Sequence, residues 1–356
     1  MMKILLLSRY ANLGASSRLR TLQYLPFLKN EGIDVTVAPL LDNNYVKSLY
    51  SGKSRSVKDI FYLYLSRFIF LLKSSKFDLL WIEKELFPWV PAFVESIIEK
   101  VRVPYVVDYD DPTFHTYDKH ASGLVRSIFG DKIDSVMRHA KLVLVGNKYL
   151  EQRAREAGAP WVELLPTVID LDRYIFSPPR VKDYFSVGWI GTPITERYLK
   201  LIEPALVRMY RSARLIKLVM VGAQNIIFEG IPMQFLPWSE NSEVSYINDF
   251  DVGIMPLPED HWERGKCGYK LIQYMACSKP VIASPVGINK EIVEPGINGF
   301  LCNNSDEWLE SLMRLYSHEP LRISMGAAGR EKVKNRYCLQ VTSGRLAMLL
   351  KAAAKS

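Results

Sequence analysis

The sequence predicts an α/β protein built from two Rossmann-like, doubly wound domains that face each other across a cleft. Short apolar runs, typical of strands buried in a parallel sheet, alternate with helical segments along most of the chain. The alternation stops at one turn-rich segment near the middle and then begins again. A chain of 356 residues is also long for a single hydrophobic core. The repeated pattern therefore predicts two domains of the same type.

The first series of strand signals predicts an N-terminal domain at residues 1–175. Apolar runs predict its strands at 3–8, 34–38, 78–82, 105–107 and 142–145. After the first strand, a loop at 9–17 leads into a predicted helix that continues to about Asn30 and stops at Gly32.

The second series predicts a C-terminal domain at residues 176–338. The segment 166–179, PTVIDLDRYIFSPP, lacks helical periodicity and predicts the joint between the domains. Strand signals return from 185 onward, and then at 218–222, 252–255 and 280–284. No strand follows the helical segment 340–354. We therefore predict that residues 339–356 form a C-terminal helix that could cross back to the first domain.

Composition and charge narrow the class of partner. Apolar residues make up 48% and charged residues 24% of the chain, as in ordinary globular proteins. The net charge of +8 favours acidic partners such as phosphates, nucleic acids or anionic lipids. The basic residues are spread along the chain instead of forming a block, so we expect no nucleic-acid partner. Four cysteines without metal-ligand spacing, and no signal peptide, predict reduced thiols, no metal site and a cytoplasmic location.

One apolar run raises the question of membrane contact. The run 60–72, IFYLYLSRFIFLL, is too short to span a bilayer and is interrupted by Arg67. Its basic flanks are Lys53, Arg55 and Lys58 before the run and Lys73 and Lys76 after it. Two interpretations stay open: a helix lying in the interface of an anionic inner membrane, or a helix packed on the sheet with lysines that reach to solvent.

An acidic cluster follows the predicted strand at 105–107, so its carboxylates are expected at a carboxyl end of the sheet. The cluster reads Asp108-Tyr109-Asp110-Asp111, which could bind a metal-nucleotide as a DxD motif. It also resembles the nucleophile motif of haloacid-dehalogenase phosphatases, although Pro112 displaces the pattern. A third interpretation takes Asp110, Asp111 and His115 as catalytic groups that orient an acceptor hydroxyl. In a purely structural alternative, Asp111 caps the helix that begins near Pro112.

The loop after the first strand predicts an anion site. Its residues 12–17, NLGASS, lack the GxGxxG pattern of dinucleotide sites. We predict that Ser16 or Ser17 caps the following helix, whose N-terminus would attract anions. The candidate acceptor-binding residues here are Gly14, Arg18 and Arg20. A solvated helix face is the alternative for both arginines.

A second candidate site follows the strand at 252–255. The loop after this strand carries Arg264 and Lys266, and Lys270 lies at the start of the next helix. Cations at a helix start beside the end of a strand suit a diphosphate. Gln273, at i+3 on the same helix face as Lys270, could reach ribose hydroxyls.

The strand at 280–284 leads to a further candidate group. Gly287, Ile288 and Asn289 would offer backbone amides to the same phosphates, because another short helix starts there. That helix carries Glu291.

These residues resemble GT-B glycosyltransferases of the family-4 type. The similar segments are KCGYKLIQYMACSKPVIASPVG at 266–287, Glu291, EPGING at 294–299 and VGWIG at 187–191. The resemblance covers the second domain well and the first loosely. It implies that Gly191 and Thr192 join the residues above in a site for a nucleotide-sugar donor.

The sequence departs from that family in its paired glutamates and in the first loop of the second domain, where Thr192 and Arg197 stand in the region of the usual arginine and lysine. The paired glutamates of the family fall on Gly265 and Gln273. A glutamine oxygen can still accept hydrogen bonds from ribose, more weakly than a carboxylate. Glu263 or Asp260 could replace the first glutamate.

The resemblance implies a hexosyltransferase-type glycosyltransferase that retains configuration and uses a nucleotide-diphosphate sugar as co-substrate. No metal or other cofactor is expected, because Lys266, Lys270 and helix-start amides would stabilise the leaving diphosphate. We expect a glycan or lipid-linked acceptor in bacterial surface polysaccharide synthesis, and a cytoplasmic enzyme able to rest on the inner membrane. The alternatives are a GT-B sugar-nucleotide epimerase and a degenerate GT-B module that binds nucleotide without catalysis.

Overall fold

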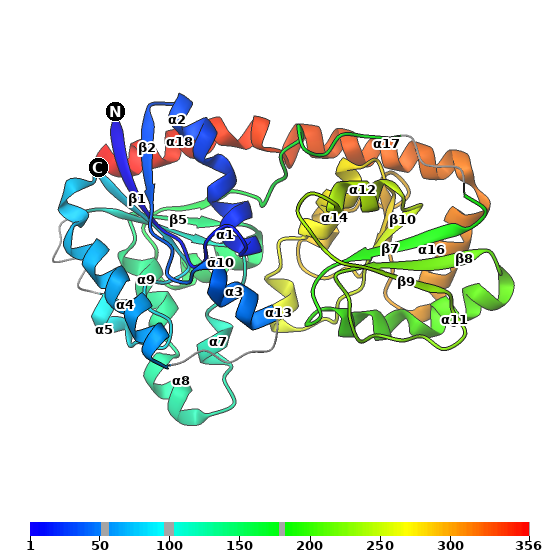
Figure 1. Cartoon of the computed structure of the whole chain (residues 1–356), viewed down its shortest axis with the longest axis horizontal. Coiled ribbons are helices and arrows are strands. Elements are labelled where there is room, and N and C mark those ends of the chain that lie inside the picture. The colour runs from blue at the N-terminus through cyan, green and yellow to red at the C-terminus, as the bar shows by residue number, and fades with distance from the viewer. Residues whose placement is uncertain (51–56, 96–102, 178–181, 356) are drawn as a thin grey trace. The chain divides into compact units, whose positions relative to one another are not determined.

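The computed structural model describes residues 1–50, 57–95, 103–177 and 182–355, and it divides the chain into two compact units (Figure 1). Unit 1 comprises Met1–Thr167, Gly265–Cys267 and Thr342–Ser356, and unit 2 comprises Val168–Arg264 and Gly268–Val341. The chain thus passes between the units at 167/168 and 341/342, where the sequence predicts 175/176 and 338/339.

A six-stranded parallel sheet forms the centre of unit 1. Its strands are β1 Met2–Leu7, β2 Ile33–Val37, β3 Leu79–Glu83, β4 Tyr105–Tyr109, β5 Leu142–Val145 and β6 Val162–Leu164. They lie in the order β2-β1-β3-β4-β5-β6. The direction of winding reverses between β1 and β3, and in open α/β sheets ligands bind beyond the strand ends at such a reversal. The loops after β1 and β3 are therefore the place to look for a site.

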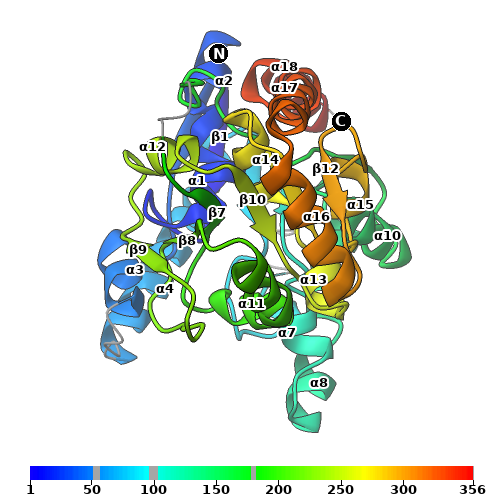
Figure 2. The same cartoon turned by 90° about the vertical axis from the view of Figure 1, so that its right-hand side faces the viewer.

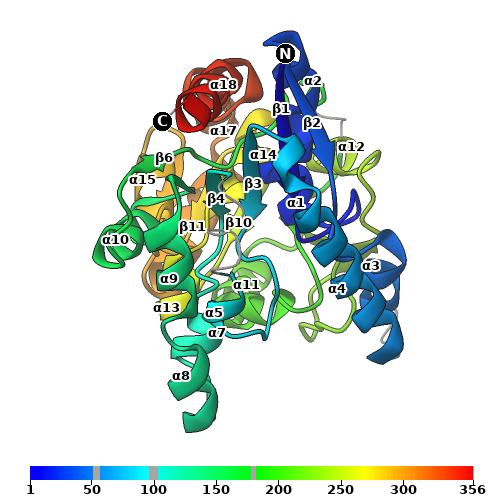
Figure 3. The same cartoon turned by 90° about the vertical axis from the view of Figure 1, so that its left-hand side faces the viewer.

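The helices of unit 1 surround this sheet (Figure 3). They are α1 Ala15–Arg20, α2 Leu25–Asn30, α3 Asn43–Tyr50, α4 Val57–Leu72, α5 Ala92–Glu95, α7 His115–Asp118, α8 Gly123–Phe129, α9 Lys132–His139 and α10 Lys148–Glu156. The single helix predicted as far as Asn30 is wrong, because a 3-10 turn at Leu22–Tyr24 separates α1 from α2. Pro26 in the first turn of α2 fits that break, since proline favours a helix start.

The C-terminal helix, α18 Leu339–Lys355, contributes its residues from Thr342 onward to unit 1. The Tyr24 hydroxyl lies 3.0 Å from that of Thr342, and Lys351 pairs with Glu31 at 3.0 Å. Four apolar side chains of the helix are fully buried: Leu346, Ala347, Leu350 and Ala353. Its burial thus completes the packing of unit 1.

Unit 2 has a second six-stranded parallel sheet (Figure 2). Its strands are β7 Phe185–Ile190, β8 Ile216–Val221, β9 Met233–Leu236, β10 Val252–Met255, β11 Val281–Ala283 and β12 Gly299–Leu301, in the order β12-β11-β10-β7-β8-β9. Its helices are α11 Glu203–Ser212, α12 Glu243–Asn248, α13 His261–Arg264, α14 Tyr269–Ala276, α15 Asn289–Ile292, α16 Ser305–Ser317 and α17 Glu319–Arg336, with a 3-10 helix at Glu196–Ile202. Here the winding reverses between β7 and β10.

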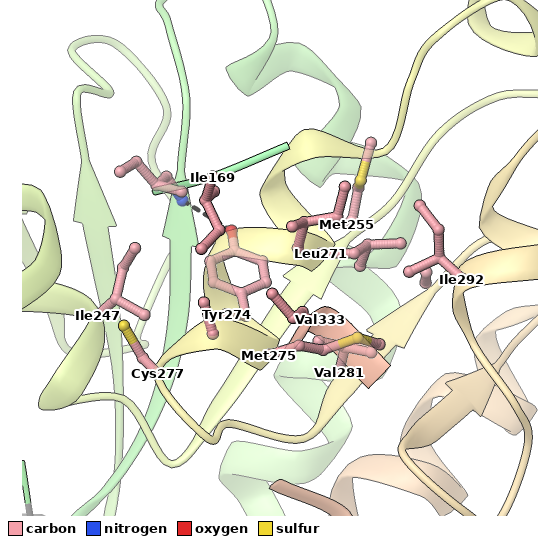
Figure 4. Close-up of a cluster of buried hydrophobic side chains, with 14 of the residues drawn as sticks. Ile169, Ile247, Met255, Leu271, Tyr274, Met275, Cys277, Val281, Ile292 and Val333 are labelled. Atoms are coloured by element: carbon pink, nitrogen blue, oxygen red, sulfur yellow. Dashed lines mark hydrogen bonds between the residues drawn. The ribbon is translucent and has the colours of Figure 1, made fainter. Parts of the chain in front are cut away.

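Apolar clusters cover both faces of the unit 2 sheet. In β8, Leu218 and Met220 belong to one cluster and Val219 and Val221 to the other, because successive strand side chains point to opposite faces. Figure 4 shows the cluster beneath α14, where Tyr274 lies among buried apolar side chains. The backbone N–H of Ile190 donates to the Tyr274 hydroxyl at 3.0 Å. This bond ties α14 to the end of β7.

The prediction of two parallel, doubly wound α/β sheets is confirmed. In the part of the chain that the structure describes, no helix combines the length and apolarity needed to cross a membrane.

Candidate functional site

A positioned cation marks the strand reversal of unit 2. Lys270, in the first turn of α14, places its ammonium 4.2 Å from the ring centre of Trp189, which is the penultimate residue of β7 and only 1% exposed. The ammonium also lies 3.5 Å from the Thr195 hydroxyl oxygen. Attraction to the indole face and this polar contact hold the charge where β7 ends. The arrangement can attract an anion without a large rearrangement of the side chain.

Gly191 makes this position possible. It directly follows β7, and a Cβ atom there would lie 2.6 Å from the Lys270 ammonium and 2.4 Å from the Trp189 ring. Any larger residue would displace the cation. Thr192 comes next, and its backbone N–H donates to the Thr195 hydroxyl at 3.3 Å. The structure therefore brings the predicted residues Gly191, Thr192 and Lys270 together.

The loop at 287–289 is closely packed against neighbouring backbone. Gly287 has φ +51°, and a Cβ atom there would lie 2.4 Å from the carbonyl oxygen of Arg264. Asn289 uses its backbone N–H within the loop, donating to Val286 at 3.1 Å, and its side-chain amide donates to the Ser284 carbonyl at 3.0 Å. The amide of Asn289 therefore serves the loop itself, while Ile288 is buried and Glu291 is exposed.

Lys266 falls in the segment Gly265–Cys267, which is part of unit 1. Its predicted grouping with Lys270 therefore stays a prediction. Packing of the same segment explains why Gly265 stands where the glycosyltransferase pattern has its first glutamate. A Cβ atom at Gly265 would lie 2.6 Å from the ring of Pro112, so a glutamate side chain does not fit there.

Glu263 is held in place within unit 2. It is 4% exposed, and its carboxylate accepts a hydrogen bond from the Tyr198 hydroxyl. Burial, together with this bond, raises the pKa of Tyr198. Asp260, by contrast, is exposed and accepts from the backbone N–H of His261 at 2.6 Å. Replacement of the missing glutamate by Glu263 or Asp260 therefore stays a prediction.

Gln273 belongs to a buried polar chain. Its amide donates to the Tyr174 hydroxyl at 2.7 Å, and that hydroxyl donates to Glu243 at 2.9 Å. Trp238 donates to the other oxygen of Glu243, also at 2.9 Å. Burial, with the nearby Tyr269 and Glu243, raises the pKa of Tyr174 well above its ordinary value. The phenol therefore keeps its single proton for Glu243, and the Gln273 amide donates to the phenol oxygen.

This chain predicts that Gln273→Glu destabilises the protein. Two buried carboxylates would then compete for one phenol proton, at a cost of about 1–3 kcal/mol for the partner left unpaired. Burial would raise the folded-state pKa of the new carboxyl above its unfolded value. The loss should therefore be largest at neutral pH and shrink as the pH falls and the carboxyl takes up a proton. Urea denaturation at several pH values measures it.

The exchange variant Gln273→Glu/Glu243→Gln is the matched control. It restores one carboxylate and one amide around Tyr174, so it should recover most of the lost free energy of unfolding. Equal destabilisation of the single and double variants would show that the hydroxyl proton does not decide the residue at 273.

In unit 1, the strand reversal holds a buried carboxylate. Glu83, the last residue of β3, is 1% exposed. It accepts hydrogen bonds from the Ser16 hydroxyl at 2.7 Å, the Ser17 hydroxyl at 2.5 Å and the backbone N–H of Arg9 at 2.8 Å. The prediction that Ser16 or Ser17 caps α1 is therefore wrong: the cap position is Gly14, and both hydroxyls face Glu83.

Lys84 forms ion pairs with two further carboxylates, those of Asp110 and Asp111. Its ammonium lies 2.9 Å from Asp110 and 3.3 Å from Asp111, and its backbone is left-handed with φ +65°. Burial opposes the charge on Lys84, but the two aspartates outweigh burial and raise its pKa above the usual range. Burial likewise opposes the charge on Asp110, yet Lys84 and Arg20 lower its pKa below the ordinary value. A strained non-glycine residue at a strand end is typical of functional sites.

The structure separates the predicted catalytic residues. Asp110 and Asp111 share Lys84, and the Asp111 side chain is 34% exposed. The ring nitrogens of His115 face Asp118 at 2.7 Å and Tyr149 at 2.8 Å, so the imidazole is not part of the Lys84 cluster. The capping alternative for Asp111 is wrong, because α7 begins at His115 with Phe114 at its cap.

The predicted acceptor residues make contacts within unit 1. Arg20 is 1% exposed and forms two bonds to Asp108, at 2.8 and 3.1 Å, so it has no surface to offer a ligand. Arg18 donates to the Asn12 carbonyl at 3.1 Å. Gly14 is required by packing, since a Cβ atom there would lie 2.2 Å from the Tyr10 side chain.

Sequence reasoning missed Glu83, Lys84 and Trp189. The signal for the first two was present, because charged residues directly follow the predicted strand at 78–82, as they do at Asp108 to Asp111. Among the described residues, no group of three or more histidine, cysteine, aspartate or glutamate side chains could hold a metal ion.

Comparisons with known proteins bear on this geometry. A family model described as "Glycosyl transferases group 1" matches residues 187–318. A Methanocaldococcus jannaschii protein described as an uncharacterized glycosyltransferase is 44% identical over 66 residues, which cover 18% of this chain and 19% of that protein.

Solved structures match over almost the whole length. Anabaena HepE, in complex with UDP and glucose, aligns with a TM-score of 0.73 at 17% identity, covering 99% of this chain and 100% of that one. Sucrose-phosphate synthase from Thermosynechococcus elongatus has a TM-score of 0.72 at 16% identity, with 100% of both chains covered. A glycosyltransferase from Rickettsia africae has a TM-score of 0.71 at 16% identity, covering 100% of this chain and 99% of that one. The chain has the fold of the GT-B glycosyltransferases.

The predicted resemblance to this group is thereby confirmed. In the GT-B chain, the segment that matches the family model includes Trp189, Gly191, Thr192 and Lys270. The Lys270 site therefore lies within the segment that matches the family model.

Proposed function

We propose that this GT-B protein is a glycosyltransferase that moves a sugar from a nucleoside-diphosphate sugar to a glycan or lipid-linked acceptor, with retention of configuration. The observation that carries the proposal is the Lys270 ammonium, held over Trp189 at the strand reversal of unit 2 with room kept by Gly191. The printed complexes of HepE with UDP, with UDP and glucose, and with UDP-glucose support a donor of this chemical class.

In the proposed reaction, unit 2 binds the donor diphosphate. Negative charge grows on the diphosphate as the bond to the anomeric carbon breaks, and Lys270 stabilises that charge in place. We propose that no metal ion is needed, because a fixed cation already lies at the site. The leaving diphosphate carries the electron pair of the broken bond and takes up the proton of the acceptor hydroxyl, while the acceptor oxygen supplies the pair for the new bond.

Unit 1 is the proposed acceptor unit. Asp111 is the partly exposed carboxylate of the Lys84 cluster, so it can accept a hydrogen bond from an acceptor hydroxyl. Asp110 is held ionised by Lys84, and it keeps the ammonium between the two aspartates. A glycan or lipid-linked acceptor fits a role in surface-polysaccharide synthesis at the cytoplasmic side of the inner membrane.

A thermal-shift panel of UDP, GDP, ADP and CMP, each with and without Mg²⁺, tests the proposal on wild type and Lys270→Ala. We expect one nucleoside diphosphate to raise Tm equally with and without metal, and the rise to be lost in the variant. No shift with any nucleotide would contradict the donor site.

A second measurement separates the rival functions. Incubation with the matching nucleotide sugar alone, followed by analysis of the sugar, would reveal an epimerase by a changed sugar without any acceptor. Binding that is never followed by release of the nucleoside diphosphate, even with acceptor-containing lipid extracts, would favour a binding module without catalysis.

A further inference from the structure

Helix α4 of unit 1 presents apolar side chains to solvent. Its exposed large hydrophobic residues are Ile60, Phe61, Tyr62, Leu65, Phe68, Ile69, Phe70 and Leu72, of which Phe61 is 64% and Leu72 67% exposed. Another helix of unit 1, α10, shows the ordinary pattern, with Leu150 and Ala154 buried and its charged residues outward. An exposed apolar face of this extent on one helix marks an interaction site.

Five of these exposed residues share one face of the helix. Phe61, Leu65, Phe68, Ile69 and Leu72 follow the i, i+4, i+7, i+8, i+11 spacing that places side chains on one side of a helix. The opposite side packs inward: Leu71 is 3% and Arg67 2% exposed. The Arg67 guanidinium donates to the carbonyl oxygens of Ser8 and Ala38. The charge that interrupts the apolar run is therefore turned into unit 1, and the outer face stays apolar.

A groove borders this face, and basic residues lie near both ends of the helix. A shallow groove of about 240 Å³ is lined by Tyr62, Leu65, Ser66, Ile69, Phe70 and Lys73. Lys58 at the start of the helix and Lys73 and Lys76 after its end are all exposed. Lys53 and Arg55, which the sequence also places beside this run, lie outside the described residues.

We propose that the outer face of α4 docks onto the surface of an anionic lipid bilayer. A helix that buries a row of aromatic and aliphatic side chains among acyl chains, with lysines at its ends, lies in the plane of the interface. The lysines then meet lipid phosphates, and the aromatic residues suit the boundary between headgroups and hydrocarbon. The 16 residues of α4 are too few to span the bilayer, which agrees with docking along its surface.

The charges favour a bilayer over a second copy of the chain. If two copies met face to face through α4, each would bring Lys58, Lys73 and Lys76 toward the same cations of the other. The acidic residue of the first turn, Asp59, cannot balance three lysines. An anionic bilayer offers the complementary charge to every lysine, and the protein's net charge of +8 adds to the attraction.

Co-sedimentation of the full chain with vesicles tests the proposal. We expect binding to vesicles of phosphatidylcholine mixed with phosphatidylglycerol, and little binding to phosphatidylcholine alone. Phe61→Ser/Leu65→Ser should weaken binding by about tenfold, because two side chains lose their apolar burial. Lys73→Gln/Lys76→Gln should weaken it by about fivefold per lysine, and only at low salt.

Matched variants control for general effects of substitution. Ile323→Ser/Met348→Ser removes two comparably exposed apolar residues from α17 and α18, and Lys29→Gln removes an exposed lysine from α2. Both controls should bind vesicles as wild type does. Since every substituted side chain is exposed, circular dichroism and Tm should show that all variants fold.

Three results would overturn the proposal. One is no binding to anionic vesicles. The second is equal binding to neutral and anionic vesicles. The third is a dimer in sedimentation equilibrium that Phe61→Ser/Leu65→Ser dissociates, because it would assign the face to a second copy of the chain.

Discussion

Replacing Lys270 with alanine is expected to lower kcat/KM for sugar transfer by about 100-fold, because one preorganised charge would be missing from the transition state. The ammonium lies 4.2 Å from the ring centre of Trp189 and 3.5 Å from the Thr195 hydroxyl oxygen, at the end of β7. Loss of a charge that acts mainly on the departing diphosphate should fall largely on kcat. Initial rates over a range of donor concentrations measure both constants.

Lys334→Ala supplies the matched control for this result. Lys334 is half exposed on α17 and forms only a surface pair with Glu331 at 3.6 Å. Its removal should leave kcat/KM unchanged. If Lys270→Ala raised KM with kcat intact, Lys270 would contribute to donor binding alone, and the proposed role in the chemical step would be rejected.

Replacing Arg20 with methionine is expected to destabilise the protein by about 3–5 kcal/mol at neutral pH, because an ionised Asp108 would stay buried without its partner. Arg20 is 1% exposed and bonds Asp108 through two nitrogens as well as the Leu165 carbonyl at 2.8 Å. Urea denaturation of wild type and variant gives the difference.

The free energy of unfolding that Arg20→Met loses should depend on pH. Burial raises the pKa of Asp108 to about 6, although Arg20 opposes the rise. The folded carboxyl thus holds its proton more tightly than the unfolded one, and its contribution to stability declines as the pH rises from about 4 to 6. Without Arg20 the folded pKa should rise further. The destabilisation of Arg20→Met should therefore shrink in acid, where Asp108 is neutral.

Arg345→Met tests whether burial of the ion pair causes the large destabilisation expected for Arg20→Met. Arg345 pairs with Glu163 at 2.6 Å in the same unit, but its side chain is 47% exposed. Exposed pairs contribute about 0–1 kcal/mol, so this variant should stay close to wild type. Similar losses for both arginines, or a pH-independent loss for Arg20→Met, would contradict the account.

The strands could be predicted well because both sheets are covered on two faces. The apolar runs at 142–145 and 252–255 match β5 and β10 at both ends, since such strands have no outward polar position. The strands β6 and β12 were not predicted, because Glu163 interrupts the apolar run of the first and the second consists of only two apolar residues after Gly299.

Charged side chains were harder to place, because the sequence does not reveal which way they turn. Arg20 looks like an anion ligand at a helix start, yet its partner Asp108 lies 88 residues away and draws it inward. Glu83 follows an apolar run and looks like a loop residue, but Ser16 and Ser17 bind it. At the other site, Lys270 stays near the surface because Trp189 supports it. These pairings depend on the order of strands, which no local pattern encodes.

The position of α18 has a consequence for synthesis on the ribosome. Residues 342–355 belong to unit 1 but are translated after every residue of unit 2. Unit 1 therefore cannot complete its packing while unit 2 emerges and folds. During that time the apolar surface that later covers Leu346, Ala347, Leu350 and Ala353 is exposed. The first unit to begin folding is thus the last to finish, and in the meantime its open surface is a natural target for chaperones.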